Sequence, residues 1–250
     1  MGGFKATLIN ELEKLRKKKK GVVAVILSLI FIIAGQLVLV ALRSGFGLRG
    51  AGSSEFPILV LSVIVNSILP LFTALVAIDS FSGEFSHNTM KICLTRPVTR
   101  FKFFIAKLSA VMIFVLANLV LVMILSTIVG ILFNANSFTL GNMMKIIVSY
   151  AVTILPMLVL ALIIITLTNI LRSGISVFFL SVLIFIAFKA LGLVFSRYSP
   201  IFFTSTLNWY TLWIMNPFPV LKILRQFLLM CGYGIIFFTG SYYLFDKKDF

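Results

Sequence analysis

Long runs of apolar residues alternate along this chain with short polar connections. Six runs are long enough to cross a bilayer, since about 20 helical residues span roughly 30 Å of hydrocarbon. They cover about residues 21–42, 56–78, 105–133, 144–167, 174–194 and 226–245. Backbone polar groups in lipid must be satisfied within their own segment, and the alternating pattern of a barrel strand is absent. The pattern predicts an all-α, polytopic membrane protein with six transmembrane helices.

The first 20 residues have a different pattern. Phe4, Leu8, Leu12 and Leu15 fall at helical spacing with charged residues between them. This arrangement is typical of an amphipathic helix that lies along a membrane surface. The apolar run that follows is too long for a signal peptide and has no small-residue cleavage site close behind it, so we expect a retained helix.

Composition agrees with a membrane protein. Of the 250 residues, 60% are hydrophobic and only 12% are charged, too few to cover a soluble core. We therefore expect residues 1–250 to form a single transmembrane domain. The net charge of +15 is explained by basic residues on the inner side of the membrane and by attraction to anionic lipid. The expected contact is the lipid bilayer, and no nucleic acid is expected, because no basic stretch is interleaved with exposed aromatics.

The distribution of Lys and Arg predicts the orientation. Fifteen of them fall in residues 1–20, residues 83–107, the connection at Arg172 and the C-terminal tail, whereas six fall in the opposite connections. Positive residues accumulate on the cytoplasmic side. We therefore expect both termini and residues 83–107 in the cytoplasm.

The sequence contains few candidate catalytic residues and no recognisable catalytic motif. His87 is the only histidine, Cys93 and Cys231 are isolated, and no Walker lysine motif is present. Residues 45–50, GFGLRG, match a dinucleotide fingerprint only in spacing, because they follow a membrane helix instead of a strand. We expect no enzyme, no catalytic residue, no cofactor and no metal site.

Few polar residues interrupt the apolar runs. Lys189 lies about five residues from the external end of the fifth run. We expect its side chain to snorkel to the headgroups, with a substrate or ion site as the alternative. Pro70 and Pro156 are expected to kink the second and fourth helices.

The connection at about residues 195–225 is too apolar and aromatic for a free loop. We expect short helices there that lie on, or dip into, the outer leaflet. Trp209, Tyr210 and Trp213 are predicted to lie in the headgroup zone, which amphipathic rings prefer.

Residues 83–107, GEFSHNTMKICLTRPVTRFKFFIAK, concentrate charge between the second and third runs. Ser86 or Asn88 can cap a short helix from Thr89 to about Leu94. Pro97 disfavours helix at the residue before it, and Thr99 can cap a helix that begins at Arg100. These caps and the proline predict a folded cytoplasmic connection, an elbow between two membrane helices, that contains a short cross-helix. A plain positively charged loop is the simpler alternative.

The basic residues after the proline can contact lipid phosphates or a protein partner. They are Arg100, Lys102 and Lys107.

Taken in order, these residues resemble the cytoplasmic signature of the type-two ABC exporter permeases. In that family a glutamate is followed by a Thr-x-Lys-x-x-Leu-x-x-Pro-[Val/Ile]-[Ser/Thr]-Arg pattern before the third helix. The matching positions are Glu84, Thr89, Lys91, Leu94, Pro97, Val98, Thr99, Arg100 and Lys107. The basic start, the six runs, the apolar connection before the last run and the ending at residues 244–249, LFDKKD, also resemble the family.

The resemblance implies a permease that pairs with a second permease, identical or related, and with separate ABC ATPase subunits in a bacterial-type cell membrane. Residues 84–94 would form a coupling helix that docks on the ATPase, and the N-terminal helix would also touch it. The implied ATPase-coupling residues are Glu84, Thr89, Lys91, Leu94, Pro97 and Arg100. The implied function is export of an amphipathic or hydrophobic cargo.

Two other functions stay open at this point. One is a non-transporting membrane immunity or sensor subunit whose elbow binds a cytoplasmic partner. The other is an ion-driven transporter, which the lack of acidic residues in the apolar runs disfavours.

Overall fold

The computed structural model describes residues 2–46, 52–86, 99–133, 139–171, 173–195 and 197–247. Every regular element among them is a helix, as the sequence predicts. The first two are α1 (Gly2–Lys17) and α2 (Lys20–Phe46), followed by α3 (Glu55–Asn66), α4 (Ile68–Ser86) and α6 (Arg100–Phe133). The second half holds α7 (Leu140–Val152), α8 (Ile154–Leu171), α9 (Gly174–Val194) and α12 (Val220–Asp246).

The membrane-spanning helices agree with the six predicted runs. In the described part of the chain, five helices are long and apolar enough to cross a membrane, and the bent pair α3–α4 brings the number to as many as six. The helices extend beyond several predicted runs. For example, α6 begins at Arg100, five residues before the run expected from about residue 105.

Pro70 and Pro156 each follow a break in a helix by three residues. The breaks fall at Ser67, where α3 and α4 meet at 46°, and at Thr153, between α7 and α8. Proline has no N–H for the carbonyl four residues earlier, and its ring crowds that carbonyl. The predicted kink at Pro70 is therefore confirmed, whereas α7 and α8 form one continuous span that is interrupted only at Thr153.

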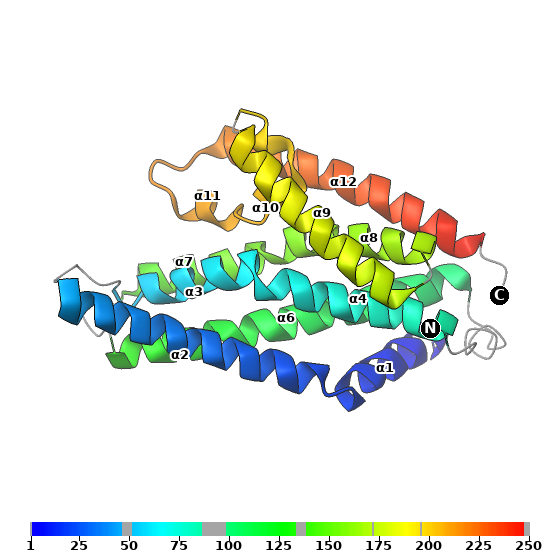
Figure 1. Ribbon diagram of the computed structural model, residues 1–250, viewed down its shortest axis with the longest axis horizontal. Coiled ribbons are helices and arrows are strands. Elements are labelled where there is room, and N and C mark those ends of the chain that lie inside the picture. The colour runs from blue at the N-terminus through cyan, green and yellow to red at the C-terminus, as the bar shows by residue number, and fades with distance from the viewer. Residues whose placement is uncertain are drawn as a thin grey trace.

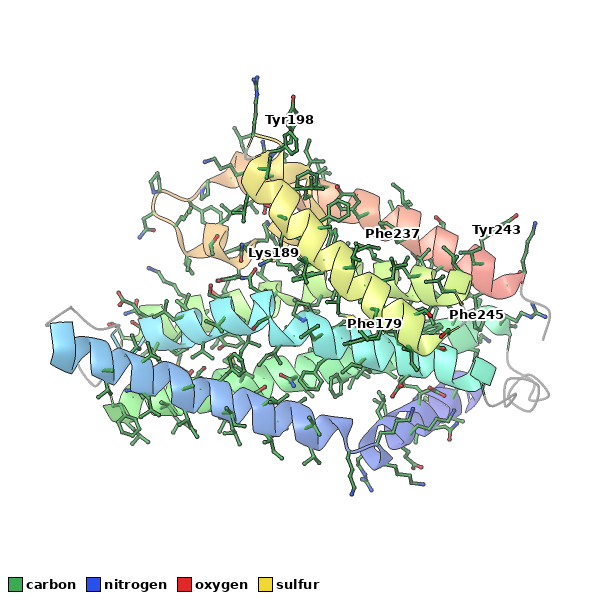
Figure 2. The ribbon with its side chains drawn as sticks, viewed as in Figure 1. Phe179, Lys189, Tyr198, Phe237, Tyr243 and Phe245 are labelled. Atoms are coloured by element: carbon green, nitrogen blue, oxygen red, sulfur yellow. The ribbon has the colours of Figure 1, made fainter. Side chains whose placement is uncertain are left out.

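The helices pack as a slab with α4, α6 and α8 inside. From one side to the other, Figure 1 shows the order α12, α8, α4, α6 and α2, with α9 crossing α8 and α4. The outer helices expose apolar faces, as lipid or another apolar surface requires. On α9 the exposed residues Ile175, Phe179, Leu183 and Ile186 repeat at helical spacing, and Phe179 is labelled in Figure 2.

Three short helices occupy the connection before α12: η2 (Ser199–Ile201), α10 (Phe203–Thr206) and α11 (Tyr210–Ile214). The prediction for the aromatic residues here is wrong for Trp209 and Tyr210, which are 4% and 2% exposed. Trp209 packs edge-on against Trp213, with ring centroids 5.4 Å apart, and stacks on Phe227 of α12. Protein neighbours bury these rings, so they do not serve as headgroup anchors.

The helix α1 lies at the same end of the molecule as the end of α12 (Figure 1). Leu8, Leu12 and Leu15 are only half-buried, whereas Thr7 and Glu11 are buried against the bundle. The predicted amphipathic helix is present. Its most buried positions, however, include a charged residue in place of the leucines.

Candidate functional site

The segment that the sequence singles out joins the end of α4 to the start of α6. The start of α6 is capped as predicted. The backbone N–H of Lys102 donates to Thr99 Oγ1 over 3.4 Å, and the N–H of Phe103 donates to the Thr99 carbonyl over 3.1 Å. The first bond satisfies an amide that has no backbone partner within the helix, and the second is the first i→i−4 bond of the helix.

The structure describes only part of the predicted coupling set. Glu84 lies in the last turn of α4, and its side chain is outside the described part of the structure. Thr89, Lys91, Leu94 and Pro97, together with the short cross-helix expected at residues 89–94, lie outside the described residues. The coupling assignment of these residues stays a prediction.

Arg100 is the member of that set whose side chain is described. It is the first residue of α6, and its Nη1 donates to the backbone carbonyl of Asp246, the last residue of α12. A cation at this position satisfies a carbonyl of the final turn, which has no partner within its own helix. Arg100 thus ties the start of α6 to the end of the chain's last helix.

The sequence predicts that Lys107 contacts lipid phosphates or a protein partner, and its burial shows that this prediction is wrong. Lys107 is fully buried two turns into α6. Its ammonium donates to Glu11 Oε2 of α1 over 3.3 Å and to the backbone carbonyl of Ser80 in α4. The ammonium also lies 5.0 Å from the ring centroid of Phe103, a distance typical of a cation–π contact. Burial of this charge is possible because an anion, a carbonyl and an aromatic ring surround it.

Glu11 completes this contact from the N-terminal helix. Its side chain is 3% exposed, and its other oxygen lies 2.8 Å from Lys14 Nζ. We call Glu11, Lys14, Lys107 and the Ser80 carbonyl the ion cluster. Asp79 directly precedes Ser80 in α4 and pairs with Lys18 at 3.3 Å. Two ionic contacts therefore fasten the α1 region to α4 and α6.

Aromatic rings surround the ion cluster. Phe81 of α4 and Phe104 of α6 are in contact, with ring centroids 5.5 Å apart. Phe245 of α12 packs against both, at 6.2 Å and 5.6 Å, and it is fully buried. Figure 2 labels Phe245 near the end of α12. Phe245, which belongs to the LFDKKD ending, thus joins α12 to the same end of α4 and α6.

Sequence reasoning did not single out Glu11 as a functional residue. The signal that was available is an acidic residue at a position that helical spacing places beside Leu8, Leu12 and Leu15. Its partner lies 96 residues further along the chain, and a single sequence contains no pattern that connects two such positions.

Lys189 does not snorkel to the headgroups. Its ammonium donates to Asn66 Oδ1 over 2.5 Å and lies 5.6 Å from the ring centroid of Phe185. Asn66 is the last residue of α3 at the break before α4. The prediction is wrong because the break places the side-chain carbonyl of Asn66 within hydrogen-bonding distance of the partly buried lysine.

The described residues show no grouping of three or more His, Cys, Asp or Glu that could hold a metal ion. The ion cluster contains one carboxylate, one carbonyl and two ammonium groups. These contacts join α1, α4 and α6.

A bundle of long apolar helices with a basic helix folded against one end defines a polytopic membrane protein. Residues 7–189, well over half of the chain, match the model of a family described as ABC-2 family transporter protein. The chain therefore belongs to the ABC-2 transporter family and is a transport membrane subunit of the permease type. The resemblance found in the sequence is confirmed. Among curated proteins no match is found.

The matched range begins within α1 and ends within α9. It includes Glu11, Arg100 and Lys107, so both partners of the buried ion pair lie inside the family's part of the chain.

Proposed function

We propose that this chain is the permease half of an ATP-driven exporter in the cell membrane. It pairs with a second permease, and separate ABC ATPase subunits bind residues 84–94 and the N-terminal helix. ATP binding and hydrolysis on those subunits shift the permeases between inward- and outward-facing states. The cargo is an amphipathic or hydrophobic compound that moves outward.

The observation that carries this proposal is the ion cluster. It joins α1, α4 and α6 through Lys107, whose three contacts come from two other helices and its own. The connection between α4 and α6 is the segment to which the family resemblance assigns the ATPase contact. A displacement of that segment is therefore transmitted to three helices that are already fixed to one another.

A second feature extends the connection to α12. Arg100 binds the carbonyl of Asp246, and Phe245 packs between Phe81 and Phe104. The end of α12 is thus expected to move together with α4 and α6. A nucleotide shifts such an equilibrium only through contacts that differ between the two states, and this end of the bundle supplies a rigid surface for those contacts.

The test uses the chain co-expressed with an ATPase that carries a Walker motif and is encoded beside it. The complex is purified by a tag on the permease, and co-purification and ATP turnover are measured in nanodiscs. Two variants act on the coupling segment, Glu84→Ala and Lys91→Pro. Asn136→Pro, in the connection between α6 and α7, is the matched control for proline insertion.

We expect the control complex to turn over ATP like the unmodified one. Both coupling variants should insert normally but lose about tenfold or more of the permease-dependent turnover, which corresponds to roughly 1.4 kcal/mol of lost coupling. Unchanged turnover in both variants contradicts the proposal. Retained partner binding with no ATP turnover dependent on the permease supports the sensor or immunity alternative instead.

A further inference from the structure

An apolar cavity of about 230 Å³ lies between α4, α8 and α9. Its walls come from residues such as Leu71 and Ala74 of α4, Leu160 and Ile164 of α8 and Phe185 of α9. Asn66, Ser67 and Pro70 also line it, so the cavity lies beside the 46° break between α3 and α4.

Polar groups gather at one end of this cavity. Asn66 lines it, accepts from Lys189 through Oδ1, and donates through Nδ2 to the Ser62 carbonyl over 2.8 Å and to Asn208 Oδ1 over 2.9 Å. Lys189 also lies over the ring of Phe185, which lines the cavity. Figure 2 shows Lys189 between α9 and the α3–α4 pair. A cation thus stands at the rim of an otherwise apolar space.

Lys107 and Lys189 have different partners. Lys107 pairs with the carboxylate of Glu11. Lys189 is held by the neutral amide of Asn66, and no carboxylate in the described part of the chain pairs with it. A charge within a membrane protein's interior is costly unless it is paired. The rim therefore offers a positive charge that an anionic group can neutralise.

We infer that this cavity binds a single-chain amphiphile with an anionic head, the alkyl or aryl tail lying between α4, α8 and α9 and the anion contacting Lys189. The inference rests on the proposed transport function and names the class of its cargo. The volume fits this choice. It exceeds the roughly 150 Å³ of a cavity that holds benzene and falls below the roughly 300–1,000 Å³ of sites for drug-sized ligands. One chain enters such a space more readily than a two-chain lipid.

The chain contains its own reporter for this site. Its only two tryptophans are Trp209 and Trp213, and Trp209 follows Asn208, the residue bonded to Asn66. A bromine atom on a tail in the cavity should quench their fluorescence. The full chain in phosphatidylcholine nanodiscs is titrated with dodecanoate brominated at its chain end. Dodecanol and dodecyltrimethylammonium, brominated at the same position, have a tail of matched length with a neutral and a cationic head group.

We expect saturable quenching by the anionic probe at a concentration about tenfold lower than by the neutral or cationic probe. Lys189→Gln should remove this preference, since glutamine can still bond to Asn66 but carries no charge, and Lys189→Arg should restore it. Lys222→Gln removes an exposed lysine at the start of α12 and is the matched control. Ala74→Leu should weaken all three probes together by filling the cavity.

Equal quenching by the three probes, or an anion preference that survives in Lys189→Gln, overturns the inference. Saturable quenching by brominated phosphatidylglycerol at the concentration of the single-chain anion also overturns it, because the occupant is then a bilayer lipid. Thermal melting of each variant identifies any that fail to fold. If Lys189→Gln does not fold, Lys189→Arg still tests the inference, because it keeps the positive charge and should keep the anion preference. No ATPase takes part in this measurement, so its failure is distinct from failure of the coupling proposal.

Discussion

At the scale of single residues, two lysines in apolar surroundings are stabilised in different ways. Lys107 has a carboxylate, a carbonyl and an aromatic ring around its ammonium. Lys189 has an amide oxygen and an aromatic ring. Hydropathy alone cannot distinguish the environment of Lys107 from that of Lys189, because both residues lie within long apolar runs. The hydrogen-bond acceptors of both lysines come from other helices, so the sequence around each lysine does not reveal them.

The first prediction concerns Lys107→Met. Methionine keeps much of the side-chain length but leaves the Glu11 carboxylate, 3% exposed, without its buried cation. Loss of one partner from a buried ion pair destabilises a protein by about 3–5 kcal/mol. We expect a fall of this size in the free energy of unfolding, measured by titration with a denaturing detergent.

Two comparisons make this measurement specific. Lys102→Met removes an exposed lysine from the same helix and should change stability by less than about 0.5 kcal/mol. Glu11→Met combined with Lys107→Met should be less destabilising than Lys107→Met alone, because the buried carboxylate that has lost its buried cation is then absent. A double variant that is less stable than either single variant would show that the ion pair is not the source of the effect.

At the scale of helices, the start and the packing of each element are decided by its cap, by breaks in the helix and by close approaches to neighbouring helices. Thr99 caps α6 through its side chain, whereas Thr139 stands at the same position before α7 without a side-chain bond to the helix. The two threonines therefore form a natural pair. The same chemistry is present at both helix starts, and only one of them uses it.

Thr99→Ala should destabilise the protein by about 0.5–1 kcal/mol, the lower part of the range for N-cap removal, because the 3.4 Å bond is long. Thr139→Ala should have an effect of a few tenths of a kcal/mol. Hydrogen exchange at the Lys102 amide is the measurement. Faster exchange there in Thr99→Ala, with no change in Thr139→Ala, is expected. Equal rates in both variants contradict the cap.

Gly130 marks a close approach between α6 and the start of α3. A Cβ added there would lie 2.6 Å from the Ser53 carbonyl and 3.6 Å from Pro57 Cδ. Gly130→Ala should therefore destabilise the protein by about 1–3 kcal/mol through overpacking. Gly141 in α7 has no atom within 4 Å of such a Cβ, so Gly141→Ala should be neutral or slightly stabilising. Thermal melting of the two variants in detergent tests this contrast, and equal melting temperatures would contradict it.

At the scale of the whole molecule, the sequence predicts the helices better than their contacts. The six apolar runs, the breaks near Pro70 and Pro156 and the cap at Thr99 follow from local physics, because each depends on neighbours within a few residues. The ion cluster does not, since Glu11 and Lys107 are 96 residues apart. Trp209 was misplaced for a related reason: an indole suits both a headgroup zone and a protein interior, and only its packing against Trp213 and Phe227 decides.

Three ionic or charge-assisted contacts gather at one end of the bundle. The α1 region, the ends of α4 and α12 and the start of α6 are joined there by Lys18 with Asp79, Lys107 with Glu11, and Arg100 with Asp246. A different polar contact, between Lys189 and Asn66, lies beside the cavity. We propose that the first region receives the motion of the ATPase and that the second receives cargo.

The most direct test of this account uses Cys93, which lies within the proposed coupling segment. The Cys231→Ser variant leaves Cys93 as the only thiol of the chain, since the sequence contains two cysteines. The complex with its ATPase is treated in membranes with a short thiol-to-amine cross-linker, and Cys93→Ser, which keeps Cys231, is the control. We predict a single cross-linked product of permease and ATPase that changes in yield when ATP is bound and is absent from the control. An ATPase that co-purifies but does not cross-link to Cys93 in any nucleotide state would contradict the central claim.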